Sequence, residues 1–278
     1  MPGFEADGAF IDYKESGSGA SLVLVHGSWV DRSNWALVQP GFERSFRTVS
    51  YSRRGHGEST GGGGLDDDVR DLAALIEHLE LAPVHLVGNS LGATICLRLA
   101  SSRPELVASL SAHEPPLFGL LADDPQWQAG LEEGNRRVGA VLELIAQGDN
   151  AQAAERFADD VALGPGTWAT FPPEARDTFI RHAATFAEEN TDPSISVIDP
   201  RLLTSVTLPV LLSGGGVSPP LFAPTLDRLE SLLGRTERHL FPEAGHVPHL
   251  TQPHEHVKAV SEFVSGTSRV TNSSGPNA

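Results

Sequence analysis

Short runs of apolar residues alternate along this chain with longer segments in which apolar residues recur every three or four positions. Leu22–Val25 is a continuous apolar run, which is typical of a strand buried on both faces of a parallel sheet. Val84–Val87 predicts a second short strand. From Leu91 the apolar residues recur at helical spacing, so this strand leads through a turn into a helix.

The same pattern predicts the remaining elements of a sheet with helices. Further strands are expected at residues 46–51, 106–112, 209–212 and 237–241, with an opening hairpin in residues 1–19 that turns at 15–19. Helices are expected at residues 34–42, 65–79, 223–233 and 255–264. This alternation of strand and helix predicts a mainly parallel sheet flanked by helices, which is the α/β fold class.

The alternation stops after Pro116. Residues 117–205 contain only helical patterns, so we interpret them as a helical cap inserted into the core domain of residues 1–116 and 206–265. Residues 266–278 are rich in Ser, Asn, Gly and Pro, and we expect a disordered tail there.

Composition excludes several classes of protein. The chain of 278 residues has 20 basic and 36 acidic side chains, a net charge of −16, which argues against nucleic-acid partners and anionic membrane surfaces. The single cysteine, Cys96, excludes an internal disulfide. No apolar run approaches a membrane span, and the N-terminus lacks a signal-peptide pattern, so a cytoplasmic location is expected. The oligomeric state stays open.

The stretch Gly88-x-Ser90-x-Gly92 lies between the predicted strand and helix. So tight a turn needs neighbours without bulk, because the two backbones nearly touch there. It holds the Ser90 hydroxyl at a helix N-terminus, where free N–H groups stabilise developing negative charge. We interpret Ser90 as a nucleophile; the alternative is an incidental serine in a glycine-containing loop.

A second candidate segment, His26-Gly27-Ser28-Trp29, follows the strand Leu22–Val25 directly. The carboxyl ends of strands are where open α/β sheets bind ligands. The backbone N–H groups of Ser28 and Leu91 are therefore candidate donors to an oxyanion. A plain turn at the end of a strand is the alternative interpretation.

A late histidine completes a resemblance. The motifs, in chain order, are His26-Gly27, Gly88-Asn89-Ser90-Leu91-Gly92 and Gly245-His246. With them the chain resembles the α/β-hydrolase family over residues 10–265, as a serine hydrolase with a helical cap. The resemblance implies that fold, with an oxyanion loop, a nucleophile elbow and a catalytic histidine at these three motifs.

A serine hydroxyl needs a base within hydrogen-bond reach, and the near-neutral pKa typical of histidine suits that role. His246 follows a predicted strand and precedes the last helix, which can bring it to Ser90. His246 and His249 also suggest a zinc site, but no third ligand stands at a recognisable spacing. We expect no metal and no cofactor.

The third member of a catalytic triad is harder to assign. Most relatives place an aspartate just after the strand at 210–212, but residues 213–220 of this chain contain no carboxylate. Glu114, at the end of the strand after the elbow helix, is the predicted substitute. The arrangement resembles that of fungal lactonases that open the resorcylic ring of zearalenone. An incomplete triad, with Glu114 in a purely structural turn, remains the alternative.

These residues predict hydrolysis of a carboxylic ester or lactone through Ser90, His246, Glu114 and an acyl-enzyme. The cap would enclose a small hydrophobic or aromatic substrate, with Trp29 and Val247 at its floor. Two alternatives stay open: hydrolysis of a carbon–carbon bond in a diketone-like compound, and ligand binding with little catalysis. Epoxide and haloalkane hydrolases of this fold resemble the chain less, because they place aspartate where Ser90 stands.

Overall fold

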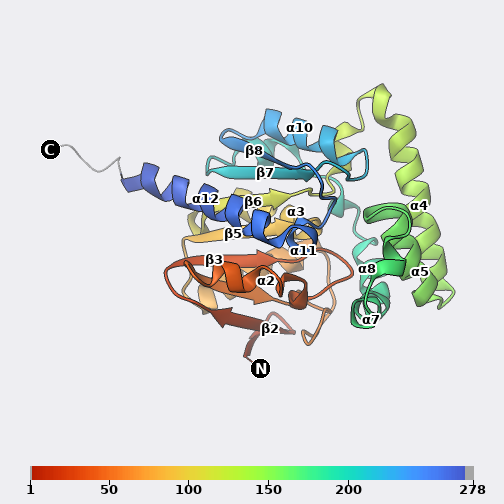
Figure 1. Cartoon of the computed structure of the whole chain (residues 1–278), viewed down its shortest axis with the longest axis horizontal. Coiled ribbons are helices and arrows are strands. Elements are labelled where there is room, and N and C mark those ends of the chain that lie inside the picture. Colours follow the sequence, from red (N-terminus) through yellow and green to blue (C-terminus); the bar gives the residue numbers. More distant parts are fainter. Residues whose placement is uncertain (1, 273–278) are drawn as a thin grey trace.

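The computed structural model describes residues 2–272, and the strands in this part of the chain form one eight-stranded sheet (Figure 1). The strands are β1 Gly3–Ala6, β2 Ala9–Ser16, β3 Ala20–Val25, β4 Phe46–Tyr51, β5 Val84–Asn89, β6 Val107–His113, β7 Val210–Gly215 and β8 Thr236–Phe241. Their order is β1-β2-β4-β3-β5-β6-β7-β8, and all pairs from β4 to β8 are parallel. This is the predicted α/β-hydrolase fold.

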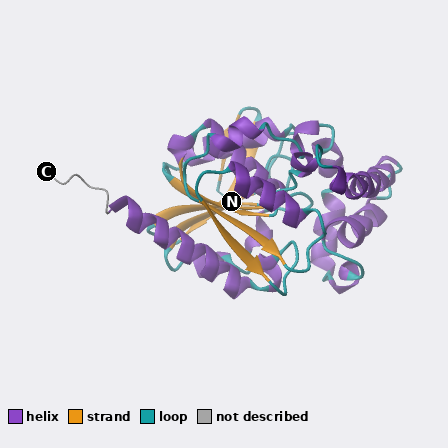
Figure 2. Ribbon diagram, turned by 90° about the horizontal axis from the view of Figure 1, so that it is seen from above, coloured by secondary structure: helices purple, strands orange, loops and turns teal. Residues whose placement is uncertain are grey.

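Helices cover both faces of the sheet (Figure 2). The helices are α1 Gln39–Phe42, α2 Leu65–His78, α3 Leu91–Ser102, α4 Gln128–Ala146, α5 Asn150–Arg156, α6 Thr167–Thr170, α7 Pro173–Arg181, α8 Ala183–Glu189, α9 Pro200–Thr204, α10 Phe222–Leu232, α11 Pro248–Thr251 and α12 Pro253–Asn272. Strand β3 shows why both faces need cover. Val23 and Val25 pack with α2 and α3 on one face, whereas Leu22 and Leu24 pack with α1 and α12 on the other. The continuous apolar run follows from this two-sided burial.

Two predicted boundaries near the N-terminus differ from the structure. The opening hairpin turns at Asp7 and Gly8, and Glu15 and Ser16, expected in a turn, extend β2 because they pair with β4. The helix expected at residues 34–42 is a 3-10 helix, Arg32–Trp35, followed by the separate α1. Pro40 accounts for the break, since a residue without an N–H belongs in the first turn of a helix.

Helix α12 corrects the prediction of a disordered tail. It continues to Asn272, so residues 266–272 are helical, and 273–278 lie outside the described residues. Val260, Phe263 and Val264 anchor the helix against the sheet. Each residue added to an established helix gains a hydrogen bond, which favours continuation of the helix beyond Val264.

Only helices lie between β6 and β7 in the described structure, and they form an insert beyond the carboxyl ends of the parallel strands (Figure 1). Within the insert, α7 and α8 follow each other directly and are separated at His182. The insert has its own apolar cluster, which includes Val141, Phe179 and Phe186, and Trp29 of the sheet part joins that cluster. The insert is therefore packed directly onto the loop that follows β3.

A buried arginine also joins the two parts. Arg53, 1% exposed, donates to Asp68 of α2 at 2.6 Å and to Glu189 of α8. Burial alone would lower the pKa of the Arg53 guanidinium, but these two carboxylates raise it. Asp68 lies with Asp66 and Asp67 in the first turn of α2, where carboxylates are stabilised by the helix dipole. No helix within residues 2–272 has the length and apolar character needed to cross a bilayer.

Candidate active site

Ser90 lies at the junction of β5 and α3 with φ 56° and ψ −126°, a backbone conformation that non-glycine residues rarely adopt. The flanking glycines explain how the turn closes. A Cβ at Gly92 would lie 2.1 Å from the carbonyl oxygen of Val25, and one at Gly88 would lie 2.6 Å from the Cα of Ala93. Only glycine lets β5, α3 and the end of β3 approach this closely. Such strain costs about 1–3 kcal/mol and is common at active sites.

The loop after β3 contacts the same serine. A Cβ at Gly27 would lie 3.0 Å from Ser90 Cβ and 3.5 Å from Ser90 Oγ, so the Gly27 backbone packs against the side chain. Ser28 follows and is half-buried. Leu91 begins α3, and the first N–H groups of a helix have no partner within that helix. Ser28 and Leu91 thus flank Ser90 along the chain and in the adjoining loop.

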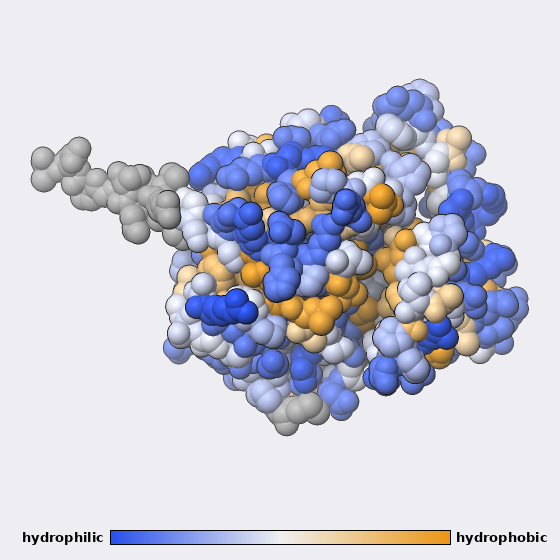
Figure 3. Space-filling view, in the orientation of Figure 1, coloured by the Kyte–Doolittle hydropathy of each residue, from blue (hydrophilic) through white to orange (hydrophobic). Residues whose placement is uncertain are grey.

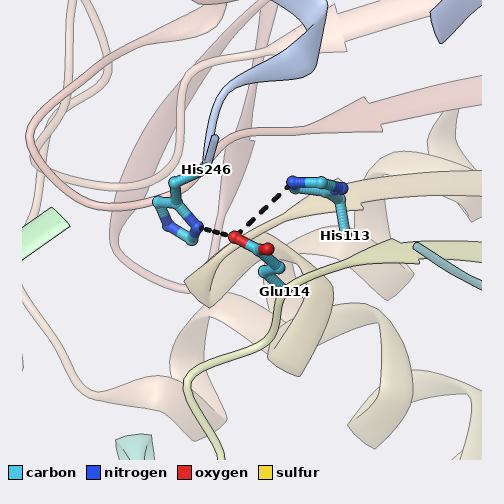
Figure 4. A group of neighbouring side chains, drawn as sticks. All are labelled: His113, Glu114 and His246. Atoms are coloured by element: carbon cyan, nitrogen blue, oxygen red, sulfur yellow. Dashed lines mark hydrogen bonds and ion pairs between the residues drawn. The ribbon is translucent and has the colours of Figure 1, made fainter. Parts of the chain in front are cut away.

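Glu114 follows β6 directly and is 1% exposed (Figure 4). Its Oε2 accepts a hydrogen bond from His246 Nδ1 at 2.7 Å, and its Oε1 accepts one from the Gly215 N–H at 2.7 Å. Burial alone would raise the pKa of the Glu114 carboxyl, but the bond from His246 and the nearby His113 lower it to about 2. A carboxylate at Nδ1 leaves Nε2 of a neutral His246 as an acceptor.

The glycine-rich end of β7 packs against Glu114, which follows β6. A Cβ at Gly214 would lie 3.4 Å from Glu114 Oε1 and 2.8 Å from Leu226 Cδ1. A side chain at this point would clash with Leu226 and press against the Glu114 carboxylate. The last residue of β7 therefore contributes a backbone donor, the Gly215 N–H, instead of a carboxylate.

Replacing Gly215 with alanine is expected to disturb both ends of this pair. The added Cβ would lie 2.5 Å from the carbonyl oxygens of Ala244 and Gly245, next to His246. Overpacking of this kind costs about 1–3 kcal/mol. We expect a lower urea midpoint together with a loss of catalytic activity in the folded variant. Gly139→Ala, where nothing lies within 4 Å, is the control. Unchanged stability and activity of Gly215→Ala would contradict the close packing.

Two further residues hold His246, and sequence reasoning did not find them. Asn89 Nδ2 donates to the His246 carbonyl at 2.9 Å, and the Phe222 ring stacks on the imidazole with centroids 4.5 Å apart. The signal for Asn89 was a polar residue at the end of an apolar strand. The sequence held no signal for Phe222. Within the described residues, no hydrogen bond joins the Ser90 hydroxyl to His246. Hydrogen bonds between catalytic groups are often long in the absence of substrate and shorten when it binds.

Trp29 lies elsewhere than expected. Its side chain has no exposed surface, and its indole stacks on Phe157 at 4.8 Å, with Phe186 at 4.9 Å and Phe179 at 6.0 Å. Aromatic side chains of the insert fill the space that the prediction gave to substrate. Val247, beside His246, is half-buried. In this conformation Val247 is the more accessible of the two residues expected at the pocket floor.

Three possible metal ligands gather at the site. The ligand atoms of His113, Glu114 and His246 lie within 4.8 Å of one another (Figure 4). The 2.7 Å contact between Glu114 and His246 is the length of a hydrogen bond, and two tetrahedral zinc ligands at about 2.0–2.2 Å would stand farther apart. His249 instead bonds Asn34 at 2.8 Å through Nε2. The arrangement fits a hydrogen-bonded acid and base better than a metal centre.

The comparison with known families agrees with this geometry. The profile of the alpha/beta hydrolase family matches residues 22–259. The chain belongs to the alpha/beta hydrolase family. In such hydrolases a nucleophile on a sharp strand-to-helix turn works with a later histidine, and the positions of Ser90 and His246 follow that order.

Curated relatives of this hydrolase are distant. It is 38% identical over 112 residues to the dihydrolipoyllysine-residue acetyltransferase component of the acetoin cleaving system of Pseudomonas putida, which covers 38% of this chain and 30% of that protein. It is 25% identical over 266 residues to a pimeloyl-[acyl-carrier protein] methyl ester esterase of Aeromonas hydrophila, which covers 91% of this chain and 99% of the esterase. The chain thus spans about a third of the first relative and nearly all of the second.

Solved structures share the fold of this hydrolase. An enol-lactonase from Burkholderia xenovorans superposes with a TM-score of 0.77 at 17% identity, covering 95% of this chain and 100% of the lactonase. An epoxide hydrolase from Bacillus megaterium gives the same TM-score at 19% identity, with 95% and 100% covered. At these identities the likeness concerns the fold alone.

Proposed function

We propose that this alpha/beta hydrolase cleaves carboxylic esters or lactones, with Ser90 as nucleophile, His246 as general base and Glu114 as the acid that orients the base. The observation that carries the proposal is the 2.7 Å bond between Glu114 and His246, beside a serine held at positive φ. The Ser90 N–H donates to the His113 carbonyl at 2.9 Å. Because Glu114 follows His113 in the chain, this bond holds the backbone of the proposed nucleophile next to that of the proposed acid.

The proposed reaction has two halves. His246 Nε2 takes the hydroxyl proton as Ser90 Oγ bonds to the carbonyl carbon, and the N–H groups of Ser28 and Leu91 stabilise the oxyanion. When the tetrahedral intermediate collapses, the carbon–oxygen bond breaks and His246 gives its proton to the leaving alcohol. Water then attacks the acyl-enzyme with His246 again as base, and Ser90 departs with the proton. Glu114 stays ionised and balances the imidazolium.

The surroundings support a small hydrophobic or aromatic acyl substrate. Apolar side chains gather where the sheet part meets the insert, whereas the outer surface of the insert is polar (Figure 3). Phe118, at the start of the insert, and Val247, next to His246 in the chain, are half-buried. Relatives whose names include an ester esterase and an enol-lactonase agree with ester-type substrates.

The first test is covalent labelling by a fluorophosphonate, read by intact mass and peptide mapping. We expect one adduct on Ser90, because the reagent needs a serine with a working base. Ser90→Ala should take up none, and Ser33→Ala, changed at an exposed serine of the 3-10 helix Arg32–Trp35, should label like the wild type. A folded wild-type chain that gains no adduct would contradict the proposal and favour ligand binding without turnover. Assays with ester, lactone and diketone substrates then separate the reaction types.

A further inference from the structure

His246 is held on three sides, and only one of the contacts is with its face. Glu114 binds Nδ1 and Asn89 binds the backbone carbonyl. The ring of Phe222 covers the face, with centroids 4.5 Å apart and planes 20° from parallel. Phe222 is 5% exposed, and Phe118 packs against it at 5.1 Å, so the stack is itself supported.

Phe222 lies at a point of the chain that also contacts Glu114. Phe222 begins α10, shortly after the end of β7, where Gly214 lies beside the Glu114 carboxylate. The end of β7 and the first turn of α10 therefore each contribute one contact. The Gly215 N–H donates to Glu114, and the Phe222 ring covers the face of His246.

An aromatic face attracts a cation, because the ring carries a negative quadrupole above its plane. As the general base, His246 becomes an imidazolium when it takes the proton from Ser90. The stack is therefore stronger in the transition state than before the reaction, which is the condition for raising kcat without lowering KM.

We propose that Phe222 is a positioning residue that fixes the plane of the His246 ring and stabilises its imidazolium through the stacked face. This inference rests on the proposed function, because it requires His246 to be the general base.

Other charged or titratable groups also face His246 and must stay constant in the test. Glu114 and His113 come from β6 and its end, and His249 comes from α11. Within residues 2–272, the rings that Phe222 contacts are those of Phe118 and His246. Changing the ring at residue 222 therefore alters one neighbour of the base.

The experiment compares Phe222→Leu and Phe222→Met with Phe222→Tyr, which keeps the aromatic face. Phe263→Leu is the matched control, since Phe263 is also 5% exposed but lies on α12 and packs against the sheet. Hydrolysis of p-nitrophenyl butyrate and the rate of fluorophosphonate labelling of Ser90 are measured from pH 5.5 to 9. Labelling needs no ester substrate, so its rate reports on the activation of Ser90 by His246 separately from substrate binding.

For the aliphatic variants we expect kcat to fall about three- to tenfold with KM unchanged. The acidic limb of both profiles should move down by about 0.5–1 pH unit, since the protonated ring loses a favourable contact. Phe222→Tyr should restore the limb. A lower rate with an unmoved limb, or the same shift in Phe263→Leu, would overturn the inference and leave the proposed function intact. A wild type that does not label at Ser90 would overturn both.

Discussion

Replacing Glu114 with glutamine is expected to lower kcat/KM by about 10⁴-fold, the loss known when the acid of a serine triad becomes an amide. Glutamine has the size of glutamate, and its carbonyl oxygen can still accept from the Gly215 N–H. The amide cannot neutralise the imidazolium, and it favours the wrong tautomer of His246. The loss should therefore fall on kcat in a chain that remains folded.

The control for this measurement is Glu105→Gln, because Glu105 is exposed and pairs with Arg103 far from the site. Activity with p-nitrophenyl esters is compared for both variants, and circular dichroism confirms the fold. Glu114→Gln that keeps nearly full activity would remove Glu114 from the mechanism, and the His-Glu-Pro-Pro segment would then be a structural turn.

Mild acid is expected to unfold this protein, because several histidines are buried in neutral form. Burial lowers the pKa of each of five histidines that are almost fully enclosed: His26, His56, His113, His249 and His256. The pKa falls to about 3 for His26 and His256 and to about 4 for His113.

The direction of the effect follows from proton uptake. Below about pH 6.5 the unfolded chain binds protons at these histidines while the folded chain does not, so stability is complete above that pH and falls below it. One pH unit below 6.5, each such histidine costs about 1.4 kcal/mol. Asp68 opposes the trend, since burial raises the pKa of its carboxyl to about 6, but it is one group against five. The combined loss approaches the 5–15 kcal/mol that typically holds a domain together.

Urea unfolding at pH 7.5, 6.5 and 5.5 measures this loss directly. His256→Phe should flatten the dependence on pH, because Trp35, Phe42 and Phe241 already surround the ring. His254→Ala, an exposed histidine of the same helix, should leave it unchanged. A free energy of unfolding that is equal at pH 7.5 and 5.5 would show that these histidines are solvated or paired in the folded state.

The sequence by itself determined the order of strands and helices in the sheet part, the helical insert and the residues at which to look for chemistry. Local rules sufficed, because buried parallel strands must be apolar and a strand-to-helix turn as tight as that at Ser90 needs glycines at 88 and 92. The prediction of Glu114 as the acid also came from the sequence, since residues 213–220 contain no carboxylate.

Only the tertiary structure decided which groups meet. The contact of Glu114 with His246 spans 132 residues, and the Gly215 N–H that holds the same carboxylate has no signature in the sequence. Trp29 lies in the aromatic cluster of the insert and not in the expected substrate pocket. Phe222 stacks on His246, and both contacts arise from packing between distant segments. Such contacts depend on how whole elements fill space together, and no local pattern along the chain records that.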